Sequence, residues 1–214
     1  MSDAATANVT VLDVLQRIRG PQAAKPRPGE RCEMCTVEIG DEHSHVVDLD
    51  NRSLMCTCRG CYLLFEVDGA GGKRFRAVPE NYRAVPGFAL SPGQWEELQI
   101  PVSVAFFFAN SREERVVGFY PSPAGATESL LPMDAWERLT NANPELAGIQ
   151  PDVEALLVRA PAEGYVVPID ACYELVGHMR RLWQGFDGGQ EARAEMDAFF
   201  SRVAARAAGA AGRS

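Results

Sequence analysis

The amino-acid sequence predicts an α+β fold, in which a small cysteine-rich β-hairpin module precedes a mixed domain of antiparallel strands and C-terminal amphipathic helices. Five of the six cysteines lie between positions 32 and 61, around a hairpin pattern. Two segments rich in β-forming residues follow at 102–110 and 115–120, and the C-terminal part carries apolar residues at helical spacing. With 214 residues, 46% of them hydrophobic, the chain can bury a core around these elements.

The charge balance bears on the partners that the chain is expected to have. A formal net charge of −8 makes nucleic acid an unlikely partner, because phosphate binding needs a basic surface. No apolar stretch approaches the roughly 20 residues of a membrane helix, and the N-terminus lacks a cationic start followed by an apolar run. We therefore expect a cytoplasmic protein without membrane insertion. Thiols stay reduced in that compartment, so clustered cysteines indicate metal or redox chemistry rather than disulfides.

Residues 1–28 are expected to form a helix and a proline-rich linker. Apolar residues repeat at helical spacing from Val11 to Ile18, and Gly20-Pro21 ends the pattern. The segment "PQAAKPRPGE" then leads to the cysteine-rich module, which we assign to residues 29–75. The glycine-rich "DGAGGKR" near its end is expected to be a turn.

The middle of this module has the pattern of a β-hairpin. In "HSHVVDLDNRSLMCTC", strand-forming residues flank Asp50-Asn51, a pair typical of a tight two-residue turn. That turn pairs His45 with Cys56. Alternation then places on one face His43, His45, Val47, Leu49, Leu54, Cys56 and Cys58, and on the other Ser44, Val46, Asp48, Ser53, Met55 and Thr57. Because the cysteine face is the more apolar one, we expect it to pack inward, provided that the register holds.

The cysteines themselves follow a metal-binding spacing. Two Cys-x-x-Cys pairs, Cys32/Cys35 and Cys58/Cys61, flank the hairpin. Each pair directs two sulfurs toward one ion, and two pairs complete a tetrahedron, as in a zinc ribbon. Rubredoxin-like iron sites also use paired turns of this kind. We predict that these four cysteines bind zinc, with iron or an iron–sulfur cluster as the alternative cofactor.

Three further donors lie between the pairs, and two assignments remain open for them. In the first, Cys56, His43 and His45 pack beside the site or orient its ligands. In the second, Cys56 or a histidine replaces one of the four cysteines, or Cys56 joins them around a cluster. Cys172 and His178 lie far from this segment, and we expect the first in a helical core and the second at the surface.

Residues 76–206 are expected to form the α+β domain. "SPGQ" at Ser91–Gln94 has the pattern of a capping box with proline at the first helical position, opening a short helix through Leu98. Strands are expected at 102–110, 115–120 and 153–158, with a short helix at 134–139. Residues 207–214 are expected to be a disordered tail.

Two amphipathic helices are expected near the C-terminus. The first is capped by Asp170, and its apolar stripe consists of Cys172, Leu175, Val176, Met179, Leu182, Trp183 and Phe186. "DGG" interrupts the chain, and a second stripe follows with Ala192, Met196, Phe199, Phe200 and Val203. No phosphate loop, dinucleotide-binding glycine motif or zinc deaminase signature occurs, so the sequence favours a non-enzymatic role.

Two stretches, "RCEMC…HSH…LMCTCRGCYLLF" and "YVVPIDACYELVGHMRRLWQGFDGG", resemble an uncharacterised actinobacterial family of cysteine-rich proteins encoded near high-affinity [NiFe] hydrogenases. The resemblance extends from about Arg31 to Phe200. It implies an accessory role in maturation, cluster delivery or electron transfer, with a hydrogenase subunit or a maturation factor as the protein partner.

We therefore expect a cytoplasmic metal-binding accessory protein that acts through protein contacts. A small iron or iron–sulfur redox carrier is the alternative. A zinc-ribbon module that binds nucleic acid is a weaker alternative, because the net charge opposes it.

Overall fold

The computed structural model describes residues 31–66, 74–160, 163–184 and 188–211. The expected N-terminal helix and proline-rich linker therefore lie outside the described residues, as does most of "DGAGGKR". The hairpin module comprises β1 (Ser44–Asp48), β2 (Ser53–Thr57), α2 (Arg59–Leu63) and β3 (Phe75–Ala77). Its three strands form one antiparallel sheet in the order β2-β1-β3.

The rest of the described chain is built around a six-stranded antiparallel sheet in the order β4-β9-β8-β5-β6-β7. Its strands are β4 (Arg83–Ala84), β5 (Val104–Asn110), β6 (Arg115–Ser122), β7 (Gly125–Ser129), β8 (Glu154–Arg159) and β9 (Glu163–Pro168). The helices are α3 (Pro92–Glu97), α4 (Met133–Ala142), the 3-10 helix η1 (Pro144–Gly148), α5 (Ile169–Leu182) and α6 (Gly189–Ala211). The α+β prediction, with antiparallel strands and C-terminal helices, is confirmed.

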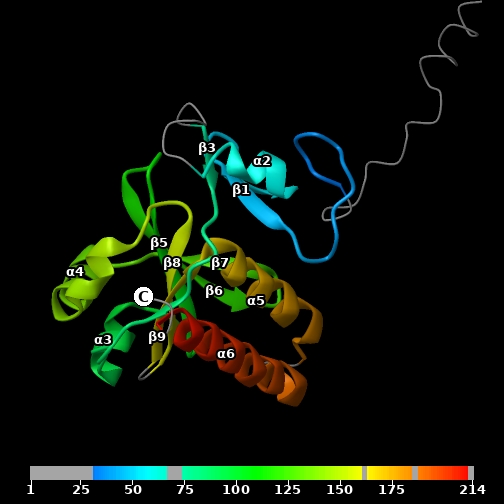
Figure 1. Ribbon diagram of the computed structural model, residues 1–214. Coiled ribbons are helices and arrows are strands. Elements are labelled where there is room, and N and C mark those ends of the chain that lie inside the picture. Colours follow the sequence, from blue (N-terminus) through cyan, green and yellow to red (C-terminus); the bar gives the residue numbers. More distant parts are fainter. Residues whose placement is uncertain (1–30, 67–73, 161–162, 185–187, 212–214) are drawn as a thin grey trace, which may run out of the picture.

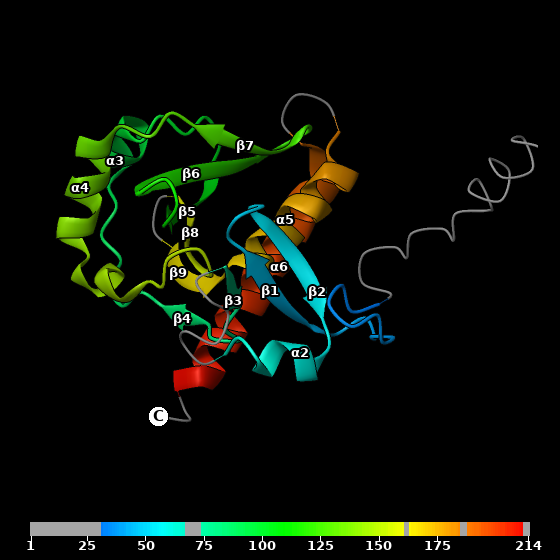
Figure 2. The same cartoon turned by 90° about the horizontal axis from the view of Figure 1, so that it is seen from above.

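Helices cover both faces of the large sheet, with α3 and α4 on one side and α5 and α6 on the other (Figures 1 and 2). Adjacent residues of β5 show why the strand is apolar throughout. Phe106 packs in the core that includes α5 and α6, while Phe107 packs in the core that includes α4. Both are fully buried. A strand covered on both faces has no polar side, so its residues form a continuous apolar run.

Several local predictions are confirmed. Ser91 and Gln94 form the expected capping box at the start of α3, with Pro92 in the first turn. Four residues of the predicted α5 stripe, Cys172, Leu175, Val176 and Met179, are buried, whereas Leu182 and Trp183 are partly buried. Phe199 and Phe200 of α6 are buried as well. Phe186 lies outside the described residues.

Two boundaries differ from the prediction. The N-cap of α5 is Pro168, and Asp170 is the second residue of the helix, where its side chain takes part in a contact described below. Helix α6 continues to Ala211, beyond the expected end at 206, because its alanine-rich last turns favour helix. Residues 212–214 of the expected tail lie outside the described residues.

The hairpin has the predicted register but a different turn. His45 pairs with Cys56, as expected, and the ladder ends at Asp48 and Ser53. The chain therefore turns through four residues, Leu49–Arg52, rather than two. The Asp48 carboxylate accepts hydrogen bonds from the backbone N–H groups of Asp50 (3.0 Å) and Asn51 (3.2 Å), which stabilises the longer loop.

The cysteine face of the hairpin packs against the core, as predicted, and the opposite face is buried as well. Val46 and Thr57, on the opposite face, are fully buried, and Asp48 is 2% exposed. Val47 and Leu54 on the cysteine face are partly buried against the core beneath α5. Helix α2 contacts both strands of the hairpin, so the hairpin is covered on both sides.

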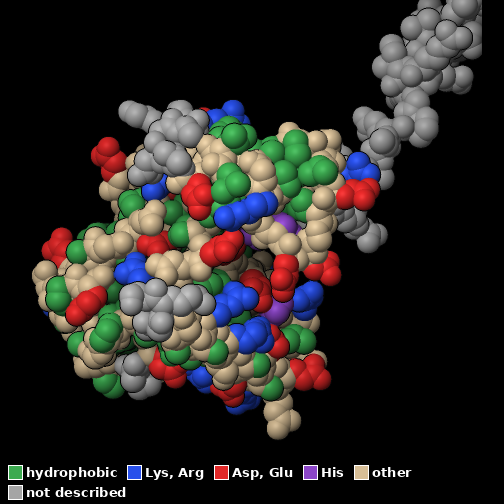
Figure 3. All heavy atoms as spheres, viewed as in Figure 1, with side chains coloured by type: hydrophobic (Ala, Val, Ile, Leu, Met, Phe, Trp, Pro, Cys, Tyr) green, Lys and Arg blue, Asp and Glu red, His purple; other side chains and the backbone are tan. Residues whose placement is uncertain are grey.

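Charged side chains connect the hairpin loop to the turn between β5 and β6 of the large sheet. Arg112 pairs with Asp50 of the hairpin loop, and Arg52 pairs with Glu113. Figure 3 shows histidine, acidic and basic side chains gathered along a depression below the module. A pocket of about 210 Å³ lies between the hairpin and the sheet; its lining includes Val47, Leu54, Arg115, Phe119, Ile169 and Tyr173.

Candidate metal centre

The first cysteine pair lies on a tight turn. The backbone N–H of Cys32 donates to the carbonyl of Val37 (2.8 Å), and the N–H of Thr36 donates to the carbonyl of Cys32 (2.8 Å). Thr36 has a positive φ of 63°, an uncommon conformation for a β-branched residue. This turn brings Cys35 back toward Cys32, so both sulfurs lie on the same side of the chain.

The second pair lies where β2 ends and α2 begins. Cys58 is the N-cap of α2, and its sulfur accepts a hydrogen bond from the backbone N–H of Cys61 at 3.4 Å. The N–H of Tyr62 donates to the Cys58 carbonyl at 3.0 Å, which closes the first helical turn.

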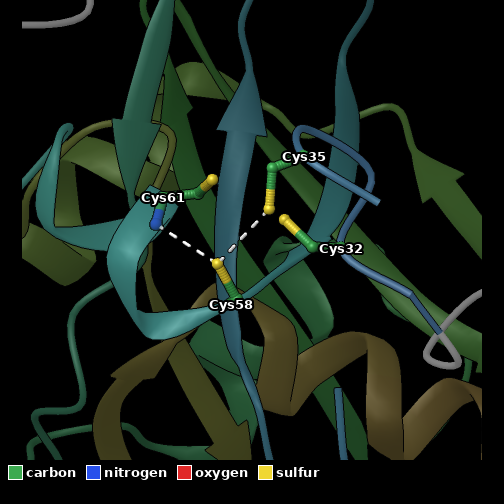
Figure 4. A group of neighbouring side chains, drawn as sticks. All are labelled: Cys32, Cys35, Cys58 and Cys61. Atoms are coloured by element: carbon green, nitrogen blue, oxygen red, sulfur yellow. Dashed lines mark hydrogen bonds between the residues drawn. The ribbon is translucent and has the colours of Figure 1, made fainter. Parts of the chain in front are cut away.

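The two pairs converge on one point (Figure 4). The sulfur atoms of the four-cysteine cluster (Cys32, Cys35, Cys58 and Cys61) all lie within 4.8 Å of one another. The Cys35 and Cys58 sulfurs, one from each pair, are 3.7 Å apart. Four thiolates around a zinc ion at about 2.3 Å would place their sulfurs about 3.8 Å apart. The cluster therefore fits a tetrahedral transition-metal ion.

The surroundings of the cluster favour ionisation at one sulfur. Burial by itself raises the pKa of the Cys32 thiol. The backbone N–H groups of Cys58, Cys35 and Met34 hydrogen-bond to it and outweigh burial, and they lower its pKa to about 6.

At Cys61 the balance is reversed. Burial first, and then the neighbouring thiols, raise its pKa to about 12. Four sulfurs this close cannot all ionise in the absence of a cation, because the thiolates repel one another. An ion at the centre lets all four become thiolates, so metal uptake releases protons.

The other three predicted donors form a separate group. The ligand atoms of His43, His45 and Cys56, hereafter the His-His-Cys group, lie within 4.8 Å of one another. His45 Nδ1 is 2.9 Å from Oδ2 of Asp170 on α5. The structure thus brings the four Cys-x-x-Cys cysteines together and places Cys56 and both histidines in a second cluster.

Asp170 contacts the His-His-Cys group, a role that the sequence analysis did not predict. It was predicted to be a helix cap, yet its carboxylate reaches a histidine 125 residues earlier in the chain. No spacing pattern connects two residues so far apart. Only the packing of the hairpin beside α5 places them together.

A comparison with protein-family models identifies the chain. The model of DUF5947, a family of unknown function, matches residues 31–207. The chain belongs to this family. The matched range includes both clusters and Asp170, and it ends within α6. No curated protein and no solved structure matches the chain.

The remaining cysteine and histidine of this DUF5947 member lie away from both clusters. Cys172 is fully buried in the core, and burial raises the pKa of its thiol well above the ordinary value. His178 was expected at the surface. It is only partly exposed, and its Nδ1 lies 2.8 Å from Oε1 of Glu195 on α6. No disulfide joins any of the six cysteines, all of which are in the described ranges.

Among the helices that the structure describes, none has both the length and the apolar character needed to cross a bilayer.

Proposed function

We propose that this DUF5947 protein is a metal-binding accessory protein whose four-cysteine cluster holds one zinc ion. The observation that carries the proposal is the convergence of two Cys-x-x-Cys turns on one point, with sulfurs within 4.8 Å. A bound zinc ion would be closed off by four thiolates and would therefore act as a structural cross-link. It would join the chain before β1 to the start of α2 and so stabilise the hairpin module.

The module also supports a role in protein contacts. Val37 follows the first cysteine pair, and Leu63 and Leu64 follow the second; these three apolar side chains are 46–60% exposed. Exposed apolar side chains on a small rigid module suit recognition of another protein. We propose that the partner is a cytoplasmic [NiFe] hydrogenase subunit or maturation factor, a proposal that rests on the sequence resemblance alone.

Metal analysis tests the metal-binding part. The chain purified anaerobically should contain zinc, and serine at Cys32, Cys35, Cys58 or Cys61 should abolish binding at the cluster. Cys172→Ala is the matched control, because that thiol is buried in the core and is not a member of the cluster. A full metal complement in any of the four serine variants would contradict a four-thiolate site.

Gene deletion tests the partner. Loss of the gene should impair hydrogenase assembly or activity, and complementation with the intact gene should restore it. A chain with Leu63 and Leu64 both replaced by serine should fold and bind metal but fail to complement. Unchanged hydrogenase activity in the deletion strain would overturn the proposed partner and leave the metal site unaffected.

One observation favours an iron-based redox carrier as the second candidate. Backbone N–H groups donate to the sulfurs of Cys32 and Cys58, and hydrogen bonds of this kind tune the potential of iron–sulfur sites. Cys35 is exposed, which gives electrons a short path to a partner. A coloured, iron-containing protein after anaerobic purification would favour this candidate, whereas a colourless protein with stoichiometric zinc would exclude it.

A further inference from the structure

The His-His-Cys group is built into the hairpin by its register. His45 on β1 pairs directly with Cys56 on β2, so their side chains project from the same face of the sheet. His43 lies two residues before His45 and therefore on that face as well. The two imidazole rings lie 4.7 Å apart, centre to centre, and the three donor atoms are within 4.8 Å of one another.

The hydrogen bonds of the two histidines determine which nitrogen is available. His43 Nδ1 lies 2.9 Å from the carbonyl oxygen of Gly40, and His45 Nδ1 lies 2.9 Å from a carboxylate oxygen of Asp170. A carbonyl and a carboxylate oxygen only accept hydrogen bonds, so each Nδ1 carries the proton. In a neutral imidazole the lone pair then lies on Nε2. Both rings are held in the tautomer that a metal ligand needs.

The far nitrogen of His43 supplies an independent observation. Its Nε2 is buried and has no hydrogen-bond partner among the described residues. A buried polar atom without a partner destabilises the fold, so folded proteins seldom leave one in place without a reason. A metal ion bound at Nε2 would remove this cost.

We propose that His43 Nε2, His45 Nε2 and Cys56 Sγ form a second transition-metal site, separate from the four-cysteine cluster. Two imidazoles and a thiolate suit ions of the zinc and copper class. Metal-bound histidines characteristically donate their other N–H to a carboxylate or a backbone carbonyl, which is the arrangement found here at both rings. Asp170 and the Gly40 carbonyl are therefore positioning groups and not ligands.

Three protein ligands leave one position of a tetrahedral ion open. Catalytic and ligand-exchanging zinc sites have this composition, whereas structural sites use four ligands. His45 and Asp170 are both partly exposed, with 20% and 26% of their side-chain surfaces accessible, so a small donor such as water or an anion can reach the ion.

The site also lies beside the pocket. Along the hairpin, the next pair after His45 and Cys56 on this face is Val47 and Leu54, and both line the pocket. On α5, Ile169 and Tyr173 line it as well, on either side of Asp170 in the sequence. An ion at the second site would therefore be bound by the hairpin, linked to α5 through the contact of His45 with Asp170, and located next to the pocket.

Metal counting tests this proposal on the full-length chain. The protein is stripped with a chelator under reducing conditions, reconstituted with excess Co²⁺ or Zn²⁺, and freed of unbound metal by gel filtration. Wild type should hold two equivalents. His43→Gln, His45→Gln and Cys56→Ser should each hold one, with the cobalt spectrum of the four-cysteine cluster retained.

Two matched controls come from the same chain. His178 makes a similar contact, between its Nδ1 and the carboxylate of Glu195 at 2.8 Å. Among the described residues, however, His178 belongs to neither group of potential metal ligands. His178→Gln and Cys172→Ala should therefore keep two equivalents. Azide added to the cobalt form should shift the wild-type spectrum, because one coordination position is open, and should not shift that of Cys56→Ser.

Asp170→Ala tests the positioning role. Removing a carboxylate that orients a metal-bound histidine weakens metal affinity by about 10- to 100-fold, so a chelator should extract one equivalent from this variant far more readily than from wild type. Asp170→Asn retains an acceptor oxygen and should recover part of the affinity.

The metal content of the wild type and of the ligand variants distinguishes a second site from its absence. A single equivalent in wild type under excess metal overturns the proposal, as do two equivalents in His43→Gln and Cys56→Ser. Because this site shares no ligand with the four-cysteine cluster, its failure would leave the proposed function intact. If one of the three ligand variants loses both metal ions and its circular dichroism spectrum changes, that variant has misfolded. The metal content of the other two ligand variants then tests the proposal.

Discussion

At the scale of single residues, Asp48 shows how the hairpin loop depends on one buried charge. Its carboxylate accepts a hydrogen bond from Arg74 at 2.8 Å as well as those of the loop backbone. The Arg74 guanidinium, helped by Asn51 and Asp50, lowers the pKa of Asp48 to about 2 in spite of burial. The ionised form is therefore the one that the fold stabilises.

The sign of the pH dependence follows from that lowered pKa. Asp48 contributes its full stability above the ordinary pKa of 3.8 and loses it as the pH falls toward 2. Asp48→Asn should lower the free energy of unfolding at pH 7 by about 1–2 kcal/mol, since the half-exposed Arg74 is screened by solvent. The difference from wild type should stay constant above about pH 5 and shrink below about pH 4. Urea unfolding at each pH measures it.

Asp134 is the control for this prediction. It pairs with Arg138 at 3.0 Å, but 73% of its side chain is exposed. Asp134→Asn should change stability little at any pH, because exposed ion pairs contribute little. An equal effect in both variants would show that the burial of Asp48 is irrelevant.

At the scale of elements, a glycine in β9 lets the ring of Phe88 pack directly against the strand. A Cβ added at Gly164 would lie 2.6–2.8 Å from ring atoms of Phe88, closer than such atoms approach in proteins. Gly164→Ala should therefore destabilise the protein by about 1–3 kcal/mol, the usual cost of overpacking, and thermal unfolding should show it. Gly177→Ala, in α5 with no atom within 4 Å, should instead be neutral or stabilising.

The elements also show what the sequence could predict. The capping box placed α3, and apolar periodicity placed α5 and α6, because these features act over a few residues. The hairpin register was predicted although its turn was not. A two-residue and a four-residue loop centred on Asp50-Asn51 give the same cross-strand pairs, so His45 still faces Cys56. Strands β7 and β9 were not predicted, because β7 contains few strongly β-forming residues and the apolar run of β9 is only three residues long, between a glycine and a proline.

For the candidate sites too, local sequence patterns predicted some features, and tertiary packing determined the others. The Cys-x-x-Cys spacing located the four cysteines that the structure brings together. Their separation from the His-His-Cys group was one of two open assignments, because spacing alone does not show which donors converge. The contact of Asp170 with His45 depends on how α5 packs beside the hairpin, which no local pattern encodes.

At the scale of the whole molecule, the hairpin module and the large sheet differ in how they are stabilised. The sheet lies between two cores that include Phe106 and Phe107. The module has few fully buried apolar residues, chiefly Val46 and Tyr62, and relies on the proposed ion and on charged contacts to the sheet. Small units with little core commonly depend on a metal for their fold.

Metal removal should therefore loosen the module selectively. After chelation under reducing conditions, backbone amides of β1 and β2 should exchange with solvent much faster, while those of β5 and β8 stay protected. Hydrogen exchange read by mass spectrometry distinguishes the two regions within one sample. Equal loss of protection in β5 and β8 would mean that the ion stabilises the whole fold and not the module.

X-ray absorption at the metal edge tests the four-thiolate cluster most directly. The Cys56→Ser variant is the right sample, because it removes a ligand of the proposed second site and leaves all four cluster cysteines in place. We expect one ion per chain with four sulfur ligands at about 2.3 Å. A variant without bound metal, or an ion with nitrogen or oxygen among its ligands, would contradict it.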